Sequence, residues 1–287
     1  MASECFMSFL TSTRLSPRIV TAVDDIPLGS LYRVMMRPYT PLLGIVFYLA
    51  AVKTWERQNK KWAATATPEQ RKAAGAGPGL KRLVVVHNLV LAVYSLWTFA
   101  DFFPAVVQNV SEHGLKGGFC DSQWTLWNRK LLAHGFLFYL SKYYEFIDTA
   151  IILAKGRPAG RLQTFHHSGA VFIMWFGNYV QSPYLSFFVF ENSIIHSLMY
   201  TYYTLTALGF KPPGKQILTG LQISQFYIAL SAGLVYGLLP GCQDRPQTVF
   251  TYVFIAYILE LIRLFTQFAR KTYGPKPAAD VAGKKTQ

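Results

Sequence analysis

The sequence predicts an all-α integral membrane protein with seven transmembrane helices. Of its 287 residues, 52% are hydrophobic and only 15% are charged, which is an apolar balance for a soluble domain. About seven apolar stretches come close to the roughly 20 residues that a spanning helix needs. The net charge of +14 comes mainly from Lys and Arg between these stretches, as in basic cytosolic loops. We therefore exclude a nucleic-acid-binding protein, which would gather its basic residues on one soluble face.

The apolar stretches divide the chain into three parts. Residues 1–35 form a lumenal segment, residues 36–269 the transmembrane domain, and residues 270–287 a polar cytosolic tail that we expect to be disordered. Between the spans, 53–82 reads as a mobile loop and 104–130 as a longer connection. The predicted spans are 36–52, which is short, 83–103, 131–154, 162–181, 184–208, 217–240 and 248–269.

The distribution of Lys and Arg orients these spans. An odd number of spans puts the termini on opposite sides of the membrane. With a lumenal N-terminus, roughly 18 basic residues face the cytosol and roughly 8 face the lumen, as the positive-inside rule favours. The C-terminal tail is then cytosolic. Its Lys284 and Lys285 resemble the dilysine retrieval signal of endoplasmic-reticulum membrane proteins. We therefore expect a multi-pass protein of the endoplasmic-reticulum membrane.

Two of the three cysteines fall in lumenal loops in this orientation. Cys120 precedes the third span and Cys242 precedes the last. Because that lumen is oxidising, we expect them to form a disulfide, the alternative being two unpaired thiols. With Cys5 as the third cysteine, the spacing matches no metal site.

Polar side chains recur at helical spacing within four of the apolar spans. In the predicted topology they all lie toward the cytosolic side of the membrane. Ionisable groups at membrane depth are costly, so we expect them to face a shared functional cavity. The residues are Lys142, Glu145 and Asp148, then Gln163, His166 and His167, then Asn192, His196, Tyr200 and Tyr203, and finally Thr219, Gln222 and Gln225.

Some polar residues have a purely structural interpretation. A single polar residue in a span often hydrogen-bonds a neighbouring helix, and this is how we interpret His87 and His134. Lys142 with Glu145 or Asp148 could be an ion pair that holds the bundle together. Packing does not explain three imidazoles at one depth beside carboxylates and amides.

The predicted cavity suits acyl transfer. A neutral imidazole can act as nucleophile or base, and amide and phenol groups can donate hydrogen bonds to a developing oxyanion. An apolar tunnel suits an acyl chain, and a basic rim suits a phosphate-bearing head group. The sequence has no G-x-S-x-G motif. We therefore predict an enzyme acting on a coenzyme A thioester, with a rim made of Lys155, Arg157, Arg161, Lys211 and Lys215.

Four motifs then resemble those of one family. KYYEFIDT, QTFHH, NSIIHSLMYTYY and TGLQISQ are similar, in order and spacing, to motifs of the ELO family of very-long-chain fatty acid elongases. The resemblance covers about residues 30–272 and implies six helices in a ring around a substrate tunnel, with the first span outside. It implies a 3-oxoacyl-CoA synthase, which condenses an acyl-CoA with malonyl-CoA and releases carbon dioxide and CoA. We expect no metal and no cofactor besides these substrates.

The resemblance also implies roles for individual residues. His166 and His196 would be the reacting imidazoles, one of which carries the acyl group, and His167 would handle protons. Lys142 and Asn192 would receive the CoA portion, while Glu145 and Asp148 would orient the imidazoles. The substrate-binding set is Lys142, Glu145, Asp148, Gln163, Asn192, Tyr200 and Gln222.

Gln163 departs from the family's frequent His-x-x-His-His box. The Gln form resembles elongases of polyunsaturated acyl chains, so we expect a polyunsaturated substrate. Gln cannot act as a base at neutral pH, so its role is a hydrogen bond. Expected partners are membrane lipid, the ketoreductase, dehydratase and enoyl reductase of the elongation cycle, and a second copy in a homodimer.

Two other classes of protein share some of these features. A membrane desaturase or hydroxylase with two irons has His-rich boxes, but needs more His ligands than the 6 His of this chain supply. A seven-helix lipid transporter would have broken helices or a charge relay across the whole bilayer. The polar residues of this chain stop at cytosolic depth.

Overall fold

The computed structural model describes residues 15–73, 75 and 77–274, and these residues form helices and no strand. The predicted all-α class is therefore confirmed. Cys5, Lys284 and Lys285 lie outside the described residues, so the dilysine signal stays a prediction.

The long helices follow the predicted apolar stretches. Short elements precede or connect them: η1 (Val23–Asp25), η2 (Gly29–Leu31), α2 (Tyr32–Met35), α4 (Pro68–Ala73) and the π-helical turn η3 (Trp127–Leu131). The third predicted span is divided at Glu145 into two helices. The long helices are α3 (Tyr39–Thr65), α5 (Pro78–Cys120), α6 (Leu132–Tyr144), α7 (Phe146–Ala154), α8 (Arg161–Tyr179), α9 (Leu185–Leu208), α10 (Lys215–Leu238) and α11 (Arg245–Tyr273).

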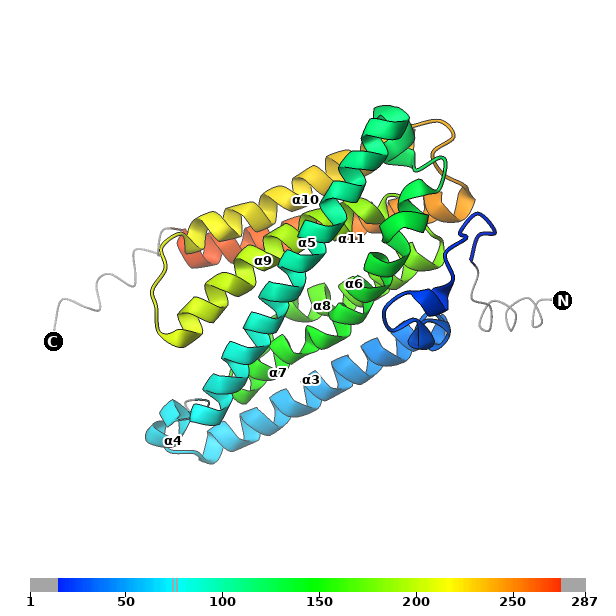
Figure 1. Ribbon diagram of the computed structural model, residues 1–287. Helices are drawn as coiled ribbons and strands as arrows, with labels where there is room; N and C mark the ends of the chain where they lie inside the picture. Colours follow the sequence, from blue (N-terminus) through cyan, green and yellow to red (C-terminus); the bar gives the residue numbers. More distant parts are fainter. Residues whose placement is uncertain (1–14, 74, 76, 275–287) are drawn as a thin grey trace.

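The long helices run side by side (Figure 1), and their contacts close a ring with α3 outside it. Around the ring, α5 packs along α9, α9 against α10, α10 against α11, and α11 against α8. Helix α8 then contacts α6 and α7, and α7 contacts α5. Helix α3 packs on α7 and α8 from outside. This is the arrangement that the resemblance implies.

The bundle is a multi-pass membrane protein by helix length and composition. Among the described residues, α5, α10 and α11 are long and apolar enough to span a membrane. The segment Gly29–Met35 and helix α3 meet at an angle of 80°, and together they count as a fourth span if they form one broken membrane helix. Helices α8 and α9 are long enough to span a membrane, but their His, Asn and Gln residues lower their hydropathy, and they are not among these candidate spans. The number of seven spans stays a prediction.

The two ends of the bundle differ (Figure 1). The α3–α5 connection and the α9–α10 loop lie at one end, and the end of α5 and the α10–α11 loop lie at the other. At this second end Cys120 and Cys242 form a disulfide, the pairing expected from the sequence, with Cα atoms 4.8 Å apart. The side of the membrane that each end faces stays a prediction.

Buried aromatic rings close the ring of helices near the disulfide. Tyr236 donates a hydrogen bond to the Cys242 carbonyl at 3.0 Å. Its ring centroid lies 5.4 Å from those of Phe119 and Tyr184. Tyr184 in turn donates to the Ala229 carbonyl. Aromatic rings therefore pack densely at this end of the bundle.

Two segments predicted as loops are largely helical. The prediction of a mobile loop at 53–82 is wrong, because α3 continues to Thr65 and α4 follows. That segment is rich in Ala, Lys, Arg, Glu and Gln, which are strong helix formers. The predicted connection at 104–130 is wrong in part, since α5 continues through Pro104 to Cys120. Gly114, with φ of 71°, accommodates a bend there.

Candidate active site

A cavity of about 560 Å³ lies inside the ring, next to the end with the α7–α8 and α9–α10 loops. Residues of α5, α7, α8, α9, α10 and α11 form its wall. The four polar stripes predicted from the sequence therefore meet in one cavity. Of the predicted site residues, those that line it are Glu145, Asp148, Gln163, His166, His167, His196, Tyr200 and Gln222.

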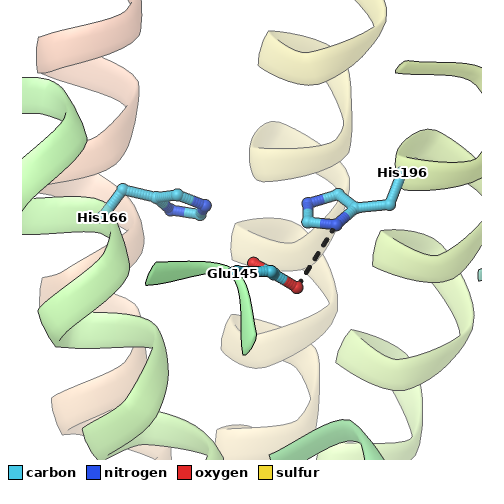
Figure 2. A group of neighbouring side chains, drawn as sticks. All are labelled: Glu145, His166 and His196. Atoms are coloured by element: carbon cyan, nitrogen blue, oxygen red, sulfur yellow. Dashed lines mark ion pairs between the residues drawn. The ribbon is translucent and has the colours of Figure 1, made fainter. Parts of the chain in front are cut away.

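Two imidazoles face each other in this cavity. Figure 2 shows the rings of His166 and His196 pointing toward one another, with the Glu145 carboxylate beside them. The nearest nitrogen and oxygen atoms of the three side chains lie within 4.8 Å of one another. His166 comes from α8 and His196 from α9, so closure of the ring sets their separation. A carbonyl carbon placed between the rings is within reach of either one.

Tyr257 of α11 holds His166 in place. Its hydroxyl donates to the main-chain carbonyl of His166 at 3.0 Å and lies 3.3 Å from Nδ1 of the same residue. A hydroxyl that donates to the carbonyl can accept a hydrogen bond from Nδ1, which leaves Nε2 with a free lone pair. Tyr257 is not among the site residues predicted from the sequence. Its hydroxyl is one of several polar groups in the last span, beside Thr251, Glu260 and Arg263, so the sequence pattern does not single it out.

Glu145 is the centre of a buried network of charges. Its Oε1 lies 2.7 Å from Nζ of Lys142 and 3.7 Å from Nδ1 of His196. Lys142 also donates to Oδ1 of Asn192 at 3.1 Å. The side chains of Lys142 and Glu145 are only 1% and 2% exposed. A carboxylate beside Nδ1 leaves Nε2 of His196 directed into the cavity.

Lys142 and Asn192 do not occupy the place expected of groups that receive CoA. Both bond inside the network, and neither lines the main cavity. Lys142 lies in the last turn of α6, three residues before Glu145, so the helix brings their side chains together. The structure matches the other interpretation of Lys142, an ion pair within the bundle.

Asp148 also differs from its expected position. Its Oδ1 lies 2.9 Å from Nε2 of His87, and Tyr200 donates to its Oδ2 at 2.7 Å. It therefore joins α5, α7 and α9 and bonds none of the three imidazoles of the cavity. His87 makes the interhelical hydrogen bond expected of it, as does His134, 2.6 Å from Oδ2 of Asp101.

Gln163 fixes the ring of His167. Its amide donates to Nε2 of His167 at 2.7 Å and lies 3.3 Å from the hydroxyl of Thr149. The ring of His167 is 5.3 Å from that of His166, between centroids. Gln222, further round the cavity, donates to Sδ of Met199 at 3.1 Å. The hydrogen-bonding role expected of Gln163 fits this geometry.

Cations gather at the mouth of the cavity. Lys155, Arg157 and Lys215 line it. Arg161, also expected at the rim, instead lies 3.2 Å from a carboxylate oxygen of Glu260. Burial lowers the pKa of the Lys155 ammonium from its usual value, and the nearby Arg157 lowers it further. A cationic mouth suits a ligand that carries phosphate groups.

Glu145, His166 and His196 carry the kinds of donor atom that can hold a metal ion. Glu145, His166 and His196 form a group of His and carboxylate donors within the described part of the chain. The Lys142 ammonium, 2.7 Å from Oε1 of Glu145, competes with a cation for that oxygen. Three donors also fall short of the ligand set that two irons require.

A family model and several known proteins match this chain. The model described as "ELO: GNS1/SUR4 family" matches residues 33–281. Very long chain fatty acid elongase 3 of Mus musculus is 30% identical over 214 residues, which cover 71% of this chain and 76% of the relative. The elongase of the same name from Homo sapiens is 29% identical over 202 residues, which cover 69% of this chain and 74% of the relative. Fatty acid elongase 2 of Trypanosoma cruzi is 28% identical over 229 residues, with 72% and 79% covered.

Proposed function

Because the chain belongs to the ELO family and is an enzyme of fatty acid elongation, we propose that it catalyses the condensing step as a 3-oxoacyl-CoA synthase. The observation that carries the proposal is the pair of facing imidazoles of His166 on α8 and His196 on α9, beside the Glu145 carboxylate. Two imidazoles that share one position for a carbonyl carbon suit transfer of an acyl group.

The reaction has two steps. Nε2 of one imidazole attacks the thioester carbonyl of the acyl-CoA, the carbon–sulfur bond breaks, and CoA leaves as the thiolate. Malonyl-CoA then loses carbon dioxide, and the resulting carbanion attacks the acyl-imidazole carbon. A carbon–carbon bond forms and the imidazole is released. The products are a 3-oxoacyl-CoA two carbons longer, carbon dioxide and CoA.

The neighbouring residues support these steps. Tyr257 and Glu145 lie beside Nδ1 of His166 and His196, which leaves each Nε2 for the substrate. His167 lies beside His166 and accepts a hydrogen bond from Gln163 at Nε2, so its proton is on Nδ1, the atom from which it would give one. The aromatic packing near the disulfide keeps water from the acyl-imidazole.

The cavity also suits the proposed substrates. Lys155, Arg157 and Lys215 would receive the phosphates of CoA at the mouth, and the apolar interior would receive the acyl chain. The Gln163 form of the motif supports a polyunsaturated chain. We place the protein in the endoplasmic-reticulum membrane with a lumenal N-terminus, working with the ketoreductase, dehydratase and enoyl reductase of the cycle.

A panel of acyl-CoAs tests this function. Microsomes that contain the protein are given labelled malonyl-CoA with saturated, monounsaturated or polyunsaturated acyl-CoAs, and the products are identified. We expect 3-oxoacyl products two carbons longer, mainly from polyunsaturated chains. Oxygen-dependent desaturation would instead support the di-iron alternative. Lipid movement across liposomes without chemical change would support a transporter.

A further inference from the structure

The contact between α8 and α11 contains a glycine at the level of the site. Gly169 lies in the interior of α8, three residues and about 4.5 Å along the helix axis after His166. A glycine in a helix interior is unfavourable compared with alanine, because it loses more main-chain freedom on folding. The presence of a glycine at this position therefore calls for a reason outside the helix itself.

The ring of Tyr257 on α11 is that reason. A Cβ atom built on Gly169 would overlap Cε2 of this ring and would lie 3.0 Å from Cδ2 and 3.2 Å from Cζ. Carbon atoms that are not bonded to each other pack at roughly 3.5–4.0 Å. Tyr257 is only 7% exposed, so close-packed neighbours surround its ring. A side chain at Gly169 therefore fits only if the ring moves.

A second contact on α8 fixes the same ring. The Phe165 ring is stacked on the Tyr257 ring, with the two centroids 5.6 Å apart. Phe165 and Gly169 are four residues apart, so they lie on the same face of α8. The Tyr257 ring thus contacts α8 at both positions, and a side chain at Gly169 would push it away from the helix.

The position of the ring determines where its hydroxyl lies. The Tyr257 hydroxyl is 3.0 Å from the main-chain carbonyl oxygen of His166 and 3.3 Å from Nδ1 of the same residue. The second distance is already at the outer limit of a hydrogen bond, so a small displacement breaks this bond. The proton of the neutral imidazole is then free to move from Nδ1 to Nε2, the nitrogen whose lone pair attacks an acyl carbon.

We propose that Gly169 is a positioning residue of the condensing reaction. Because Gly169 has no side chain, the Tyr257 ring lies against α8 and its hydroxyl reaches His166. The inference rests on the proposed function and adds to it a residue that does not line the cavity. The cationic mouth of the cavity is formed by other residues, so the effect of Gly169 belongs in kcat rather than in KM.

Steady-state kinetics of the purified Gly169→Ala protein test the inference. We expect kcat for elongation to fall about fivefold, as the loss of one hydrogen bond to His166 predicts, with little change in KM. A Tyr257→Leu protein has neither the ring nor the hydroxyl. Adding Gly169→Ala to it should lower kcat no further, because the two changes then act on the same contact.

The Tyr257→Leu background also separates the inference from a general effect on folding. The smaller leucine leaves room for the methyl group that Gly169→Ala adds. The double variant should therefore fold as well as Tyr257→Leu alone, even if Gly169→Ala by itself folds poorly. Thermal unfolding of the three proteins measures this. A double variant that is less stable than Tyr257→Leu would show that the glycine is needed for a reason other than the ring.

Gly177→Ala is the matched control on the same pair of helices. A Cβ atom on Gly177 would lie 2.8 Å from Cζ of Phe250 on α11, so this substitution also disturbs the contact between α8 and α11. Gly177 is eight residues, or about 12 Å, further along α8 than Gly169. We expect Gly177→Ala to lower the melting temperature and to leave kcat close to wild type.

Three kinetic results would overturn the inference and leave the proposed function intact. The first is a wild-type kcat in Gly169→Ala. The second is an equal loss of kcat in Gly169→Ala and Gly177→Ala, which would assign the effect to helix packing in general. The third is a further loss of kcat when Gly169→Ala is added to Tyr257→Leu. Failure of the wild-type protein to elongate any acyl-CoA would instead refute the proposed function itself.

Discussion

The imidazoles of His166 and His196 face different partners. Nδ1 of His166 faces the Tyr257 hydroxyl at 3.3 Å, whereas Nδ1 of His196 faces a Glu145 oxygen at 3.7 Å. A neutral phenol and a carboxylate stabilise a positive charge on the ring to different degrees. The partner of His166 can be removed without disturbing the buried charges around Glu145.

Tyr257→Phe removes only the hydroxyl that holds His166. We expect kcat for elongation to fall about fivefold, as loss of one hydrogen bond of about 1 kcal/mol predicts, with little change in KM. Tyr252→Phe is the matched control, because Tyr252 is on the same helix and 60% exposed. Steady-state kinetics of both variants check the prediction, and a wild-type kcat in Tyr257→Phe would contradict it.

The sequence predicts the residues of the site better than it predicts their partners. Helical spacing within single apolar spans is enough to bring His166, His167 and His196 to one depth. Partners such as Tyr257 for His166, or His87 for Asp148, depend on the register between helices far apart in the chain. No pattern within one span contains that information.

At the scale of helices, the C-terminal extension of α3 holds the loop that carries part of the basic rim. Glu56 accepts a hydrogen bond from the main-chain N–H of Ala159 at 2.8 Å. Asn59 donates to the main-chain carbonyl of Leu153 at 2.7 Å. Lys155 and Arg157 lie between these two attachment points.

Glu56→Ala and Asn59→Ala should therefore act through the loop rather than the chemistry. We expect each to raise KM for the CoA substrates about fivefold, the effect of one lost hydrogen bond, with kcat close to wild type. Gln58→Ala, at an exposed position between them, is the control. Unchanged KM values in both variants, or an equal loss of kcat, would show that the loop needs no such support.

This extension also shows what the sequence does not reveal about the helices. Residues 53–65 contain good helix formers, yet charges and the Gly- and Pro-rich stretch that follows suggest a loop. Contacts with the α7–α8 loop, through Glu56 and Asn59, favour the helical form. These contacts are tertiary, so local composition does not predict them.

At the scale of the whole molecule, the disulfide joins two distant parts of the ring. Cys120 ends α5, and Cys242 lies between α10 and α11, 122 residues later. We expect Cys120→Ser or Cys242→Ser to lower the stability of the protein, by about 3–5 kcal/mol for a loop of this length, and to leave kcat close to wild type. Thermal unfolding and elongation assays separate the two effects. A non-reducing peptide map in which both thiols are free would refute the pairing.

The overall architecture follows from the sequence because a membrane allows few alternatives. Spanning segments must satisfy their backbone groups internally, so apolar stretches of this length become helices. Hydropathy and length select three helices of the described residues as spans, or four with the bent pair. The residues that make the site, such as Gln163 and His196, are the same residues that make α8 and α9 less apolar.

Trapping the acylated enzyme tests the role of the facing imidazoles most directly. The purified protein is incubated with an acyl-CoA alone, without malonyl-CoA, and its peptides are analysed by mass spectrometry while released CoA is measured. We predict one acyl group on the peptide that contains His166 or His196, with an equal amount of CoA released. We also predict that His166→Ala and His196→Ala fold normally but do not elongate. Release of CoA only when malonyl-CoA is present, with no acylated peptide, would contradict a His-linked intermediate.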